Sequence, residues 1–150
     1  MNNFFKFEAD FVDSLRCIPM QIRLKLDTCG VKLKLAHWNQ FSPTERQILL
    51  TMPCETLEES QAYREFLQAL VKEKTGTPAG ELPCESNPPW EDGTTIPENV
   101  RTKAAEFGLI FTLEKWQDLT PLQRFALIKL SRPSHENRNF YPALQEFGLL

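Results

Sequence analysis

The sequence LAHWNQFSPTERQILL, residues 35–50, recurs 78 residues later as LEKWQDLTPLQRFALI, residues 113–128. Each copy places a tryptophan four residues before a Ser-Pro or Thr-Pro pair, and a Glu or Gln lies three residues after the hydroxyl. This spacing is typical of a helix start with a capping box, in which a hydroxyl residue is followed by a proline and then by an acidic or amide residue. The repeat therefore predicts that one helical motif is used twice.

The match continues toward the N-terminus, where Ile18-Pro19 corresponds to Ile96-Pro97 and Gly30 to Gly108. Between these markers both copies space their apolar residues at i, i+4 and i+7, which places them on one face of a helix. Each copy is therefore predicted to hold three short helices, over residues 18–53 and 96–131. The apolar residues are Ile22, Leu26 and Cys29 in the first copy, and Val100, Ala104 and Phe107 in the second.

The residues that follow each first helix are less clear. Residues 31–35, Val-Lys-Leu-Lys-Leu, alternate in polarity, and residues 109–113 are similar. A helix is the main prediction for both stretches, and a short strand is the alternative.

A longer helix is predicted between the two copies, over about residues 56–74. Thr56 and Glu59 form a capping box, and an apolar stripe runs from Tyr63 to Val71. Residues 75–95 contain four prolines, three glycines and four acidic residues but no Lys or Arg, which predicts a long acidic loop. The expected fold is a mainly α, single-domain helical bundle spanning residues 1–150, with a short helical tail.

Composition restricts the function. The chain has 150 residues, 41% hydrophobic, and a net charge of −3. A mildly acidic chain is a poor partner for nucleic acid or for an anionic membrane surface. No apolar run approaches the roughly 20 residues that span a bilayer, and the first ten residues do not resemble a secretory signal. We expect a cytoplasmic protein that binds neither nucleic acid nor membranes.

No catalytic or cofactor motif is evident. The four cysteines, Cys17, Cys29, Cys54 and Cys84, lack zinc-ligand spacing, and they are expected to be reduced thiols. Cys17 beside Arg16 could be activated as a nucleophile, but no base signature accompanies it. The main prediction is a protein that is not an enzyme and holds no metal or cofactor. Two alternatives stay open, namely a metal- or redox-handling protein using its cysteines and a DNA-binding regulator of the helix-turn-helix kind.

Trp90 is the one tryptophan outside the repeats, and it lies in the acidic loop. The favoured interpretation is that Trp90 tucks onto the body of the protein and pins the loop. The alternative is an interface anchor, because tryptophan is enriched among residues that dominate binding energy at interfaces. The predicted partner-binding residues are Trp90, Glu91 and Asp92 in the loop, and Phe4, Phe5 and Arg16 near the N-terminus.

The run from Phe4 to Asp27 resembles the opening of the nitrate-reductase-associated proteins of cyanobacteria. Residues 35–46, the Ile96-Pro97 pair and residues 116–124 are similar as well. The resemblance covers nearly the whole chain, and it carries no catalytic residue. It implies an accessory or maturation factor required for assimilatory nitrate reductase, acting like a chaperone by protein–protein contact. The partner would be the apoenzyme during molybdenum-cofactor insertion, or the mature enzyme.

Overall fold

The computed structural model describes residues 5–8, 18–83, 88–132 and 138–150. The chain is mainly helical, as predicted, and the only sheet within the described ranges has two strands. The fold divides into two compact units. Of the described residues, the first unit contains Glu8 and residues 18–83, and the second contains residues 5–7, 88–132 and 138–150.

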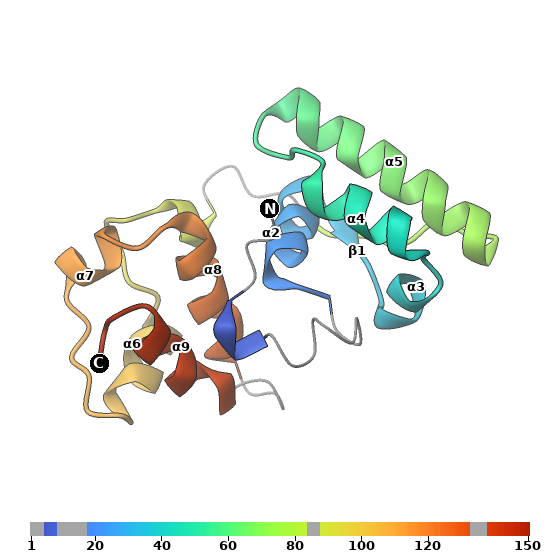
Figure 1. Ribbon diagram of the computed structural model, residues 1–150. Coiled ribbons are helices and arrows are strands. Elements are labelled where there is room, and N and C mark those ends of the chain that lie inside the picture. Colours follow the sequence, from blue (N-terminus) through green and yellow to red (C-terminus); the bar gives the residue numbers. More distant parts are fainter. Residues whose placement is uncertain (1–4, 9–17, 84–87, 133–137) are drawn as a thin grey trace. The chain divides into compact units, whose positions relative to one another are not determined.

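The first unit is built around its longest helix, α5, drawn in green in Figure 1. Helix α2 packs against both α5 and α4, and α3 packs against α5. The two strands pair antiparallel, with Val31 opposite Glu81 and Lys32 opposite Gly80. The elements are α2 (Met20–Cys29), β1 (Val31–Lys32), α3 (Leu35–Asn39), α4 (Pro43–Thr51), α5 (Leu57–Thr75) and β2 (Gly80–Glu81).

Large apolar side chains that face one another form the core of this unit. Trp38 on α3 is 1% exposed, and Tyr63 and Leu67 on α5 are fully buried. The Tyr63 hydroxyl donates a hydrogen bond to the Leu49 carbonyl oxygen at 2.9 Å. That bond satisfies the phenol, which would otherwise be a buried donor without a partner.

The second unit is centred on α8, which packs against α6, α9 and the 3-10 helix η2. Its core includes the fully buried Trp116, Phe125 and Phe140. At the start of this unit, Phe5 stacks on Phe7 and meets Phe147 edge to face. The elements are η1 (Lys6–Glu8), η2 (Pro89–Glu91), α6 (Glu98–Ala105), α7 (Leu113–Gln117), α8 (Pro121–Leu130) and α9 (Phe140–Glu146).

The helices of the two predicted copies begin in step. Helix α2 begins at residue 20 and α6 at residue 98. The starts of α3 and α7 are residues 35 and 113, and those of α4 and α8 are residues 43 and 121. The two helices of each pair therefore begin 78 residues apart. One contact is also repeated, because Arg46 donates to the Trp38 carbonyl and Arg124 donates to the Trp116 carbonyl. That the two sets of helices superimpose in space stays a prediction.

The helix starts follow the predicted chemistry. The Ser42 hydroxyl accepts from the Glu45 N–H, and the Glu45 carboxylate accepts from the Ser42 N–H. Thr120 and Gln123 form the same reciprocal pair at α8, and Thr56 and Glu59 do so at α5. Gly30 and Gly76 end α2 and α5 with positive φ angles of 78° and 92°, where a side chain would be strained.

Two predictions need correction. Residues 31 and 32 form strand β1 rather than helix, because the neighbouring β2 supplies a pairing edge that alternation alone could not reveal. Residues 109–112 are neither helix nor strand, and α7 begins only at Leu113. The described part of the predicted loop, residues 75–95, contains the short elements β2 and η2. None of the described helices combines the length and the apolar character needed to cross a membrane.

Candidate partner-binding site at the Trp90 loop

The candidate site is the segment Pro88–Thr94, called here the Trp90 loop. Pro88 and Pro89 open the 3-10 helix η2, because proline fixes φ near the helical value and supplies no N–H that would need a partner. The Glu91 N–H donates to the Pro88 carbonyl at 3.0 Å, which closes the turn. The prolines and this bond therefore give the loop a defined backbone.

Arg124 on α8 attaches the loop to the helices of the second unit. Its side chain is buried, and its Nε donates to the Trp90 carbonyl at 2.7 Å while Nη1 donates to the Trp116 carbonyl at 3.2 Å. A guanidinium is always charged and carries five donors, so burying it is tolerated only where acceptors surround it. The Trp90 loop supplies one of those acceptors.

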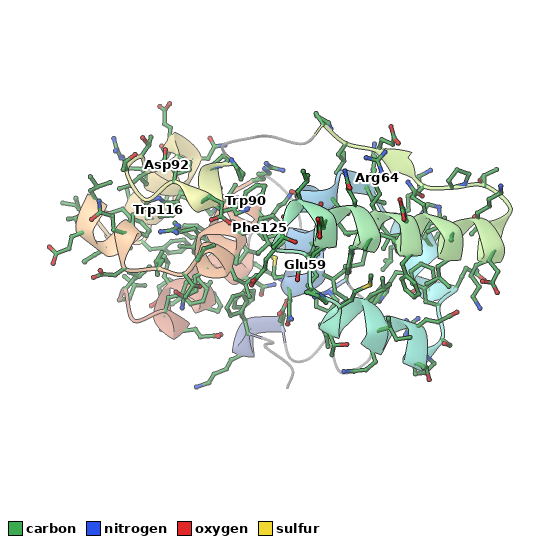
Figure 2. The ribbon with its side chains drawn as sticks, turned by 90° about the horizontal axis from the view of Figure 1, so that it is seen from above. Glu59, Arg64, Trp90, Asp92, Trp116 and Phe125 are labelled. Carbon is green, nitrogen blue, oxygen red and sulfur yellow. The ribbon has the colours of Figure 1, made fainter. Side chains whose placement is uncertain are left out.

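A hydrogen bond from one tryptophan and a ring contact of another also hold the loop. The Trp116 indole Nε1 donates to the Asp92 carbonyl at 3.0 Å. The Trp90 ring meets the buried Phe125 ring edge to face, with centroids 5.1 Å apart and planes at 90°, a favoured geometry for aromatic pairs. Figure 2 shows Trp90, Asp92, Trp116 and Phe125 gathered in this unit.

The end of the loop is a tight turn at Asp92. The Asp92 carboxylate accepts hydrogen bonds from the backbone N–H and the hydroxyl of Thr94. These bonds lower the pKa of Asp92, and the positive charge of Arg124 contributes in the same direction. Gly93 lies close to the body of the unit, since an added Cβ would lie 3.4 Å from both Arg124 Nη1 and Gln117 Cγ.

Part of the loop is exposed to solvent. Pro89 and Glu91 are exposed, and Trp90 and Asp92 are half-buried. A rigid tryptophan beside acidic groups suits contact with a protein surface that offers a basic or polar rim around an apolar spot. Within the described ranges, no three His, Cys, Asp or Glu side chains converge as a metal site.

The structure brings together three of the predicted residues, Trp90, Glu91 and Asp92. Phe5 packs in a different cluster of the same unit, on Phe7 and Phe147. Phe4 and Arg16 lie outside the described residues.

The contacts of Arg124 and Trp116 with the loop could not be predicted, because the repeat shows only that these positions correspond to Arg46 and Trp38 of the first copy. A signal was nevertheless present at the next position. The second copy has Phe125 where the first has Gln47, and the extra aromatic ring marks the surface on which Trp90 docks.

Fold and site together define a small, mainly helical protein whose Pro-rich acidic loop is fixed to a helical unit by a buried arginine. The chain belongs to the family described as conserved nitrate reductase-associated protein, whose family model matches residues 4–147. Comparisons with curated proteins and with solved structures give no match.

Proposed function

We propose that this protein is an accessory factor for assimilatory nitrate reductase and acts in the cytoplasm by binding another protein. The observation that carries the proposal is the family match over residues 4–147, since the family is described by its association with nitrate reductase. The Trp90 loop supports a binding role, because Pro89 and Glu91 are exposed on a segment with a defined backbone.

The loop is preorganised for binding. Arg124, Trp116 and Phe125 hold its backbone and the Trp90 ring before any partner arrives. A segment that is already ordered loses less conformational entropy on association, so more of its contact energy contributes to affinity. Glu91 remains exposed and can pair with a basic group on the partner.

A maturation or stabilising role suits this arrangement. The protein would hold the apoenzyme while its molybdenum cofactor enters, or keep the mature enzyme in an active form. Either role needs only a binding surface, and no catalytic group of this chain has a step to perform.

Co-purification with nitrate reductase tests the proposal. The tagged protein should retain the enzyme, in its apo or mature form, at micromolar concentrations. Trp90→Ala and Glu91→Lys should weaken retention. Glu65→Lys is the matched control, because Glu65 is an exposed glutamate on α5 and undergoes the same charge change far along the chain.

The results distinguish the proposed function from the proposed contact surface. If neither form of the enzyme is retained, the proposed function is wrong. If the enzyme is retained equally by the Glu91→Lys and Glu65→Lys proteins, the function stands but the Trp90 loop is not the contact surface.

A further inference from the structure

Two buried thiols lie together in the first unit. Cys29 is the last residue of α2, and Cys54 lies in the connection between α4 and α5; they are 2% and 6% exposed. The Cys29 and Cys54 Sγ atoms each lie 3.7 Å from a carbonyl oxygen, of Leu26 and Lys25 respectively, which are neighbours on α2. Both sulfurs therefore lie beside the same turn of α2.

Lys25 fixes the chain beside Cys54. Its ammonium donates to the carbonyl oxygens of Leu50 and Met52 at 2.6 and 2.7 Å, so the segment leading to Cys54 is fastened to α2. These contacts hold the two sulfurs at the same end of α2. Their proximity is therefore built into the packing of α2 against the end of α4.

The surroundings favour a thiolate at Cys54. The Cys29 thiol lowers the pKa of Cys54 by donating to it, and the Ser60 hydroxyl and the Lys25 charge act in the same direction. Burial and the Glu59 carboxylate oppose them. A thiolate is the nucleophile of disulfide exchange, and a lowered pKa acts in favour of Cys54 as the attacking residue.

The helical framework does not require this pair of thiols. The positions 78 residues later are Phe107 and Arg132, and the second unit forms the equivalent helices α6, α7 and α8 with those residues. The thiol pair is thus a feature added to one copy only.

We propose that Cys29 and Cys54 are a redox-active dithiol that closes to an intramolecular disulfide by exchange with a small-molecule disulfide. The Cys54 thiolate attacks one sulfur of that disulfide, whose S–S bond breaks, and the first small thiol leaves. The Cys29 thiol then loses its proton and attacks the Cys54 sulfur, releasing the second small thiol. Two protein thiols are oxidised and one small disulfide is reduced.

Peptide mapping of the unaltered protein tests this directly. The folded protein is incubated with oxidised and reduced glutathione, alkylated and digested with trypsin, which places the four cysteines on separate peptides. The expected product is residues 26–32 linked to residues 47–64, accumulating as the oxidised fraction rises and disappearing with excess reductant. Oxidation should leave the helical circular dichroism unchanged.

Single substitutions identify the order of attack. Cys29→Ser should stop at a Cys54–glutathione mixed disulfide, whereas Cys54→Ser should leave Cys29 largely unmodified. A Cys17→Ser/Cys84→Ser protein is the control and should still form the link. The proposal is overturned if both thiols stay reduced in the folded protein across the glutathione series, or if the linked peptides contain other cysteines.

Discussion

Arg124 and Arg46 occupy positions 78 residues apart and make the same bond to the carbonyl of the preceding tryptophan, yet their surroundings differ. Arg124 is 7% exposed and also binds the Trp90 carbonyl. Arg46 is half-buried, and its guanidinium lies 5.3 Å from the centre of the Trp38 ring. The additional bond to the Trp90 carbonyl therefore makes Arg124 the residue that anchors the candidate site.

Replacing Arg124 should therefore lower the free energy of unfolding more than replacing Arg46. Arg124→Ala leaves two carbonyls without their donor and detaches the loop, so we expect the free energy of unfolding to fall by about 2–4 kcal/mol. Arg46→Ala removes a bond and a ring contact near solvent and should lower it by about 1 kcal/mol. Urea unfolding of both proteins measures the two values, and equal losses would contradict the anchoring role.

The two repeat tryptophans differ in the same way. Trp116 Nε1 donates to the Asp92 carbonyl, whereas Trp38 Nε1 finds no acceptor in the part of the chain that the structure describes. Replacement by phenylalanine removes similar ring area in both cases but breaks a hydrogen bond only in Trp116→Phe.

Trp116→Phe should therefore destabilise the protein by about 1 kcal/mol more than Trp38→Phe does. Urea midpoints of the two variants, compared with the unaltered protein, provide the measurement. A larger loss for Trp38→Phe would show that its indole N–H has an acceptor in solution.

At this scale the sequence predicted that Trp38 and Trp116 are buried, whereas partner binding by Trp90, Glu91 and Asp92 stays a prediction. It could not predict what holds the loop, because a bond from Arg124 to Trp90 joins residues 34 positions apart. The local pattern around Arg124 offers one indirect signal, the aromatic Phe125 where the first copy has Gln47. The proximity of Cys29 and Cys54 depends on packing between α2 and the end of α4.

Among the elements, the helices were the most predictable. Helix α5 was expected over about residues 56–74 and spans Leu57–Thr75, because a capping box begins it and Gly76 ends it. These signals are local and need no partner. Strands β1 and β2 lie about fifty positions apart and have two residues each, so only their pairing defines them.

The capping box of α5 makes a prediction about acid. The Glu59 carboxylate accepts from the Thr56 and Glu55 N–H groups, both at 3.0 Å, and these bonds lower the pKa of Glu59 below its ordinary value of 4.5. A carboxyl group with a lowered pKa in the folded state stabilises the fold above the ordinary value. That stabilisation is lost as pH falls through the lowered value.

Glu59→Gln keeps an oxygen that can accept a hydrogen bond but removes the titration, as Gln123 does naturally at α8. The unaltered protein should lose more stability than Glu59→Gln as pH falls from about 5 to about 3. Urea midpoints at several pH values give the comparison, and identical acid dependence in the two proteins would contradict the capping contribution.

For the whole molecule, we propose that residues 1–150 form a single cooperative domain, although contacts divide the fold into two compact units. Differential scanning calorimetry should then give one transition, with equal calorimetric and van't Hoff enthalpies. Two resolved transitions would show that each unit unfolds as a domain of its own.

The central claim is that this protein supports nitrate reductase by binding rather than by catalysis. Its most direct test is deletion of the gene, followed by separate measurement of nitrate reductase protein, molybdenum-cofactor content and activity. We expect activity to fall together with cofactor content or enzyme protein. The intact gene should restore activity, and a Glu91→Lys gene should restore it less. Unchanged enzyme protein, cofactor content and activity in the deletion strain would contradict the proposed function.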